Sequence, residues 1–211
     1  MPGEASLSDR GISWAELWDS IWKKGNAMLT QPTDGIGVIV PLGSGYSKEA
    51  DQMERAQMLS MLCSSVVINP EYQAHDITWD GIAETFCNRA TREVMEGMGY
   101  TLLPPKINAN QLCAHFEARP EVWREVDFQE AAKLAQRGAL VVLGVVWDPH
   151  GHVTAVAPEP AQESGTWGES VPMVAHVGGG KTPNGIVKAS AAFTAAQRPT
   201  LRAWAWEASI V

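Results

Sequence analysis

Cysteine, basic residues and long apolar runs are all scarce in this chain. Three of its 211 residues are cysteine, Cys63, Cys87 and Cys113, and an odd number without paired spacing fits a reduced compartment better than a disulfide framework. Lys and Arg number 16 against 24 Asp and Glu, which argues against a nucleic-acid partner because phosphate binding needs clustered positive charge. No apolar run approaches the ~20 residues of a membrane span, so we expect none.

The N-terminus lacks the pattern of a secretory signal. Its first ten residues read MPGEASLSDR, without a basic start followed by an apolar stretch. We therefore expect the protein to be made in the cytoplasm. If its target is the cell wall, another system must deliver it to the periplasm or the wall, and the sequence identifies neither a delivery protein nor an inhibitor.

Length and composition favour one domain with one sizeable core. Hydrophobic residues make up 45% of the chain and charged residues 19%, as in an ordinary globular protein. We expect a single domain over 1–211, in which 1–70 form a mainly helical region packed on the core. Two helices are predicted there, over 12–30 and 47–67. The first has an apolar stripe formed by Trp14, Leu17, Trp18, Ile21 and Trp22.

The segment from Thr85 to Tyr100 has the pattern of an amphipathic helix that begins with a cysteine. Phe86, Ala90, Val94 and Met98 recur at steps of four, Thr85 can cap the start, and Gly97 and Gly99 can end the helix. Cys87 then lies in the first turn, where free N–H groups and the helix dipole favour a thiolate. Most cysteines are buried structural residues, but this position suits a nucleophile if an imidazole reaches it.

A histidine follows in a predicted hairpin. Residues 139–147 are almost wholly apolar and β-branched, which indicates a central strand, and 148–151 carry turn residues. The partner strand covers 152–157, so His152 is its first residue. An imidazole fixed there is rigid enough to face the helix that begins near Cys87.

These motifs resemble a known superfamily. The letters FCN at 86–88, MG at 98–99, GHVTAV at 151–156 and VAHVGG at 174–179 are similar to those of the papain-like NlpC/P60 and CHAP amidases, which cut bacterial cell-wall peptides. The resemblance covers roughly residues 80 to 195. The chain carries Thr85-Phe86-Cys87-Asn88 where NlpC/P60 proteins usually have Asp-Cys-Ser-Gly, so the subfamily and the bond that is cut stay open.

The resemblance implies an α+β fold with a papain-like core, in which an antiparallel sheet packs against the nucleophile helix. It also implies a cysteine amidase or endopeptidase that acts on peptidoglycan stem peptides. Cys87 would attack as a thiolate and His152 would pair with it and protonate the leaving amine. A third polar group must orient the imidazole; the resemblance places it at His176, and Glu169 is the alternative in a CHAP-like arrangement.

The sequence gives weaker indications about a substrate groove and about cofactors. Tyr72, Trp79 and Asn88 are candidates to line a substrate groove. We expect no metal, because Cys113 and His115 lack a second ligand pair at zinc spacing, and no cofactor. The glycine-rich end of the 171–177 strand mimics a phosphate-binding loop but lacks its first glycine and its following helix.

The remaining segments complete the expected fold. Helices are predicted over 108–115 and 121–136, a loop over 159–169, and further strands over 186–193 and 200–206, the last one half-buried. Two other functions stay open: a papain-like hydrolase or deamidase that acts on a different amide, and a non-catalytic module that binds a ligand in its groove.

Overall fold

The computed structural model describes residues 48–73, 85–148, 150–178 and 182–210, all within a unit of the chain that spans Ser47–Val211. The predicted helix over 12–30 and Trp79 lie outside the described residues. The described chain mixes helices and strands in the α+β manner predicted from the sequence. Its helices are α2 (Lys48–Ile68), α3 (Cys87–Gly97), α4 (Ala109–Glu117), α5 (Phe128–Gln136) and α6 (Ala189–Ala192), with short 3-10 turns at Pro70–Tyr72, Arg198–Thr200 and Glu207–Ser209.

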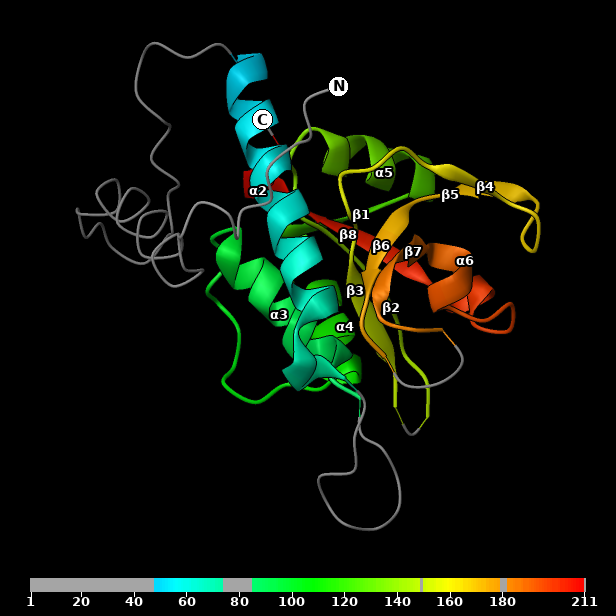
Figure 1. Ribbon diagram of the computed structural model, residues 1–211. Coiled ribbons are helices and arrows are strands. Elements are labelled where there is room, and N and C mark those ends of the chain that lie inside the picture. The colour runs from blue at the N-terminus through cyan, green and yellow to red at the C-terminus, as the bar shows by residue number, and fades with distance from the viewer. Residues whose placement is uncertain (1–47, 74–84, 149, 179–181, 211) are drawn as a thin grey trace. The chain divides into compact units, whose positions relative to one another are not determined.

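The strands form one larger sheet and two hairpins. The larger sheet has the order β1-β8-β2-β3, with every neighbouring pair antiparallel. Strands β6 and β7 form one hairpin, and β4 and β5 form the other. Figure 1 shows β3 and β6 side by side, with β7 beyond β6 and with α3 on the other side of β3. The strands are β1 (Trp123–Val126), β2 (Val141–Val145), β3 (His152–Ala155), β4 (Gln162–Ser164), β5 (Glu169–Val171), β6 (Met173–His176), β7 (Gly185–Lys188) and β8 (Arg202–Trp206).

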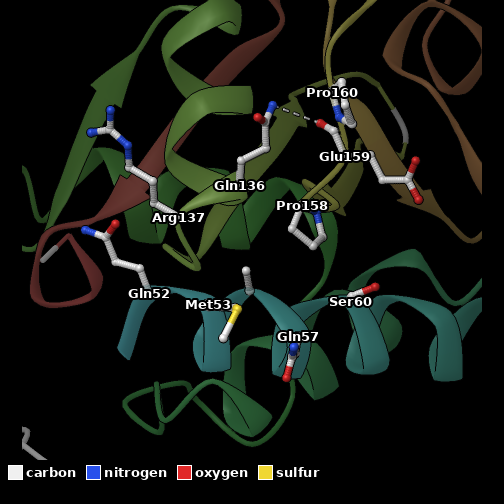
Figure 2. A pocket seen from close by; sticks show the side chains of 10 residues that line it. Gln52, Met53, Gln57, Ser60, Gln136, Arg137, Pro158, Glu159 and Pro160 are labelled. Atoms are coloured by element: carbon white, nitrogen blue, oxygen red, sulfur yellow. Dashed lines mark hydrogen bonds between the residues drawn. The ribbon is translucent and has the colours of Figure 1, made fainter. Parts of the chain in front are cut away.

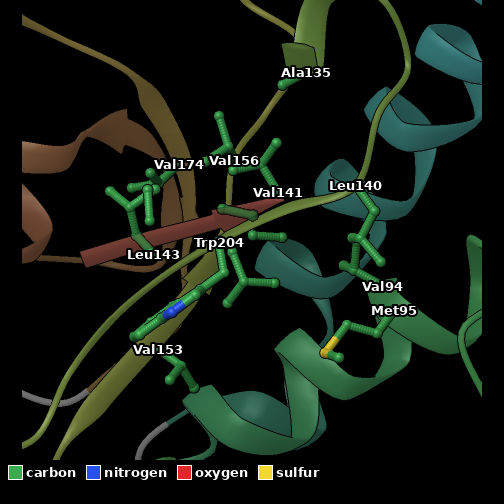
Figure 3. Packing of buried hydrophobic residues seen from close by; sticks show 14 of the residues in the cluster. Val94, Met95, Ala135, Leu140, Val141, Leu143, Val153, Val156, Val174 and Trp204 are labelled. Atoms are coloured by element: carbon green, nitrogen blue, oxygen red, sulfur yellow. The ribbon is translucent and has the colours of Figure 1, made fainter. Parts of the chain in front are cut away.

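The core forms around β2, which the apolar run predicted as a central strand. All five of its residues are buried, as expected for a strand covered on both faces. Figure 3 shows Leu143 of β2, Val153 of β3, Val174 of β6 and Val94 of α3 among the side chains of this core. Each fully buried aliphatic side chain of this size contributes about 1.5–3 kcal/mol relative to an exposed one. The core therefore fixes β3, β6 and α3 against one another.

Helix α3 confirms the amphipathic pattern and its glycine stop. Phe86, Ala90, Val94 and Met98 are all buried. Gly99 has a φ of 97°, and the N–H of the following tyrosine bonds the carbonyl of Met95, which closes the helix in a Schellman motif. The predicted cap was wrong: the N-cap residue is Phe86, which makes no side-chain cap hydrogen bond. Thr85 instead directs its hydroxyl to the thiol of Cys87.

Three other expectations need correction, each because of contacts that lie far away in the sequence. The segment 121–136 is not one helix: residues Trp123–Val126 pair with β8 as a strand, and Asp127 then caps α5 by accepting the N–H of Glu130. The segment 186–193 begins as strand β7 but ends as α6, where alanine favours the helix. Strand β8 lies inside the sheet between β1 and β2, and its residues after Arg202 are all buried, so it is not half-buried.

The predicted loop 159–169 contains a hairpin. Strands β4 and β5 pair through the register Glu163↔Ser170, and Gly168 closes the turn with a φ of 66°. Among the helices of the described ranges, none is both long and apolar enough to cross a membrane.

Candidate active site

Cys87 and His152 are brought to the same place by the packing of α3 on β3. Each is the first residue of its element, and the two elements are in contact. The thiol of Cys87 accepts a hydrogen bond from the backbone N–H of Val153, the residue that follows His152. The sulfur therefore lies at the beginning of the strand that carries His152, and the roles of the two side chains as nucleophile and base stay a prediction.

His152 and His176 form a close pair of imidazoles. His152 begins β3 and His176 ends β6; the Nε2 atom of the first lies 3.3 Å from Nδ1 of the second. The ring centroids are 5.2 Å apart in an edge-to-face arrangement, and the ring of Phe193 packs against His152 at 4.9 Å. For His152 to take a proton through Nδ1, its Nε2 must carry hydrogen and donate to His176. This contact can therefore fix the tautomer that a general base needs.

The ring of His176 is buried and closely packed. The residue is 4% exposed, and its Nε2 is buried without a hydrogen-bond partner of good geometry among the described residues. Gly178 lies against the ring: a Cβ at this position would be 2.8 Å from Cε1 of His176 and 3.6 Å from Cε1 of His152. A side chain at this position would displace the His176 ring, whereas its contact with His152 would be ordinary van der Waals contact.

Burial keeps the thiol of Cys87 and the imidazole of His152 neutral. Burial raises the pKa of the Cys87 thiol, while hydrogen bonds from the backbone N–H groups of Val153 and Asn88 oppose the rise. Burial, followed by the positive charge of a protonated His176, lowers the pKa of His152 to about 3. Burial also lowers the pKa of His176. The thiolate expected from the helix N-terminus is thus not the resting state of Cys87.

Glu169 occupies a different position from the histidine pair. Its two carboxylate oxygens accept hydrogen bonds of 2.6 and 3.0 Å from Arg198, whose guanidinium also stacks on the rings of Phe128 and Trp167. This ion pair lowers the pKa of Glu169. The described polar contact of His152 is with His176, so the geometry favours His176 over Glu169 as the orienting residue.

The groove candidates make structural contacts. The hydroxyl of Tyr72 donates to the carboxylate of Glu93 on α3, and burial raises its pKa. The side-chain amide of Asn88 donates to the carbonyl of Ile107 at 2.7 Å, which joins α3 to the segment before α4. Both residues stabilise the surroundings of α3, and their place in a substrate groove stays a prediction.

Asn184, which the sequence did not single out, ties the histidine pair to the rest of the fold. Its side-chain oxygen accepts the N–H of Gly178 at 3.1 Å, and its amide donates to the carbonyl of Tyr72 at 3.1 Å. The segment after β6 is thus held to the 3-10 turn Pro70–Tyr72 that follows α2.

The other two cysteines are buried structural residues. Cys63 and Cys113 are both fully covered, and burial raises each pKa to about 12. His115 hydrogen-bonds the hydroxyl of Tyr100 at 2.6 Å and the guanidinium of Arg119 at 2.9 Å. In the described ranges no three His, Cys, Asp or Glu side chains are arranged to hold a metal ion.

Cys87 is 4% exposed, so its thiol is covered in the structure. A cavity of about 480 Å³ lies elsewhere, between α2, the end of α5 and the segment 158–160 (Figure 2). Gln136 crosses its edge and donates to the carbonyl of Glu159 at 3.3 Å. Cys87, His152 and His176 are not among the residues that line it.

Comparison with known proteins gave no relative: no protein-family model and no curated protein matched the chain.

Proposed function

We propose that this protein is a cysteine amidase or endopeptidase that hydrolyses amide bonds of peptidoglycan stem peptides. The observation that carries the proposal is the hydrogen bond from the N–H of Val153 to the sulfur of Cys87, which brings the thiol to the start of the strand whose His152 contacts His176 at 3.3 Å. A thiol, a base and a third group that orients the base are the parts that nucleophilic acyl transfer needs. The substrate class comes from the resemblance of the sequence motifs to NlpC/P60 and CHAP amidases.

The proposed reaction starts from a neutral thiol at Cys87 and a neutral imidazole at His152. The sulfur of Cys87 attacks the amide carbonyl carbon while its proton passes to Nδ1 of His152. The imidazolium then returns this proton to the leaving amine as the C–N bond breaks, which leaves a thioester on Cys87. Water, deprotonated by His152, attacks the thioester; the C–S bond then breaks, the acid is released, and His152 returns the proton to the sulfur of Cys87. The N–H of Val153 stabilises the charge that develops on sulfur, and His176 accepts the hydrogen of Nε2.

The fold gives the proposal further support. An antiparallel sheet packs against the helix that begins with the cysteine, and the histidine begins the neighbouring strand, as in a papain-like core. Sub-ångström placement of these groups matters because a misplacement of about 1 Å can cost on the order of 100-fold in rate. The buried core under α3 and β3 supplies that rigidity.

Digestion of purified sacculi, followed by mass spectrometry of the products, tests the proposal. We expect new soluble muropeptides with the wild-type protein and none with Cys87→Ala. Cys63→Ala is the matched control, because it removes a buried thiol of the same core away from the site, and it should digest like the wild type. Equal digestion by Cys87→Ala would refute the mechanism. Intact sacculi with Cys87-dependent cleavage of another amide would refute the substrate class.

The burial of Cys87 supports a second candidate, a non-catalytic module that binds its ligand without using the thiol. Alkylation by iodoacetamide at pH 6 separates the two candidates, since a catalytic thiol reacts with an electrophile far faster than a structural one. We expect Cys87 to react faster than Cys63 and Cys113. Equal rates at the three cysteines would favour the binding module.

A further inference from the structure

Strands β3 and β6 separate from each other just before the residues of the candidate site. Their pairing within the described ranges is an isolated antiparallel bridge, Val156↔Val174, next to which the N–H of Ala157 bonds the carbonyl of Met173. In a regular antiparallel ladder, hydrogen-bonded pairs recur every two residues. The following pairs would join Ala155 to Ala175, and then Val153 to Val177.

At the first of these positions, Ala155 with Ala175, a side chain bonds the backbone of the neighbouring strand. Thr154 is fully buried, and its hydroxyl donates to the carbonyl of Ala175 at 2.6 Å. This is the carbonyl that the N–H of Ala155 would meet in a continued ladder. A side-chain hydroxyl therefore joins the two strands at a position where a continued ladder would use a backbone N–H.

At the second position, Val153 with Val177, the bond from β3 goes to Cys87. The N–H of Val153, which would face Val177 in a continued ladder, is bonded to the sulfur of Cys87. The same register places His152 opposite Gly178, in agreement with the short distance from a Cβ at Gly178 to the His152 ring. The opening of the ladder therefore lies where Val153 bonds the sulfur and where His152 contacts His176.

We propose that Thr154 is a positioning residue, whose hydroxyl holds β3 and β6 apart so that Val153 can bond the Cys87 sulfur and His152 can contact His176. Only the expected effect of Thr154 on catalysis rests on the proposed function. The geometry itself can be tested without any substrate. Thr154 does not touch the reacting atoms and acts through the strands that carry them.

Thr154→Val keeps the shape of the side chain and removes the hydroxyl. Without it the carbonyl of Ala175 has no hydroxyl partner and can draw the N–H of Ala155, which closes the ladder. We expect kcat on sacculi to fall about 10- to 100-fold with little change in KM, because the reacting groups are displaced by part of an ångström. We also expect slower alkylation of Cys87 and a changed pH dependence of that alkylation. Thr154→Ser restores the hydroxyl and should recover both quantities to within about threefold of wild type.

Ser164→Ala is the matched control, since Ser164 is a buried residue whose hydroxyl accepts the N–H of Trp167 in the distant β4–β5 hairpin. It should lower the melting temperature but leave the alkylation rate and kcat unchanged. If Thr154→Val keeps the wild-type alkylation rate and pH profile, the role is refuted. If the wild type fails to digest sacculi, the proposed function fails, and the alkylation rates of the three variants still decide the role of Thr154.

A second measurement covers the case in which Thr154→Val does not fold. In the Cys87→Ala protein the N–H of Val153 loses its acceptor, so its amide proton resonance should move upfield by NMR while that of Ala157 stays in place. An unmoved Val153 resonance would show that its N–H is bonded to β6, and the proposal would be overturned.

Discussion

Gly178→Ala should disturb the histidine pair more than its small size suggests. The new Cβ would lie 2.8 Å from Cε1 of His176, about 0.6 Å short of ordinary van der Waals contact. The ring cannot yield easily, because it is buried and held against His152. Overpacking of this kind costs about 1–3 kcal/mol in the free energy of unfolding. The backbone of Gly178 does not have a positive φ, so the whole effect comes from the ring contact.

The catalytic effect should exceed what the loss of stability alone would cause. A shift of the His176 ring by about half an ångström breaks its alignment with Nε2 of His152, and we expect kcat to fall roughly 10- to 100-fold. Gly185→Ala is the control, since it lies in the same hairpin and its Cβ would meet its nearest atom at 3.8 Å. That variant should keep the wild-type kcat and stability within about 0.5 kcal/mol.

Three measurements decide the outcome for Gly178→Ala. Chemical denaturation gives the free energy of unfolding, sacculus digestion well below the melting temperature gives kcat, and ¹⁵N NMR of the imidazoles reports the tautomers without substrate. A Gly178→Ala protein with wild-type stability and unchanged His152 resonances would refute the close packing of glycine on the two rings.

Two other predictions concern the ionisable groups. Because burial lowers the pKa of His152 from 6.5 to about 3, the unfolded chain binds a proton there between these pH values that the native protein does not. Stability should therefore fall as pH drops from 6.5 toward 3, and the slope of melting temperature against pH should be smaller for His152→Gln; equal slopes would contradict the shift. Glu169→Gln should retain kcat and lose at most about 1 kcal/mol, because its pair with Arg198 is over a third exposed. His176→Ala should lose roughly 10²- to 10⁴-fold in kcat, and the reverse ranking would make Glu169 the orienting residue.

Elements with local signals could be predicted from the sequence. The glycine that ends α3 at a φ of 97° is one example, and the capping box formed by Asn108 and Gln111 at the start of α4 is another. The buried run of β2 was equally clear. In each case residues within a few positions of one another determine the conformation.

Segments whose conformation depends on distant partners could not be predicted. Trp123–Val126 is a strand because it pairs with Ala203–Trp206, about 80 residues later, and its own composition allowed a helix. The residues of the candidate site also divide into those that the sequence predicts and those that it does not. Motifs marked Cys87, His152 and His176, whereas Thr154 and Gly178 gain their importance from the way β3 and β6 separate, which leaves no pattern in either strand alone.

The charge state of Cys87 shows why a motif does not determine the chemistry of a site. A helix N-terminus stabilises a negative charge by ~0.3–1 kcal/mol, and this favours the thiolate. Removing a charge from water costs on the order of several kcal/mol, so burial outweighs the helix terminus and the pKa of Cys87 rises. The same burial prevents His152 from being protonated in advance. In the proposed mechanism the charge therefore forms together with the bond to the substrate, when the N–H of Val153 and the contact with His176 can stabilise it, and a shift of either strand would raise the barrier directly.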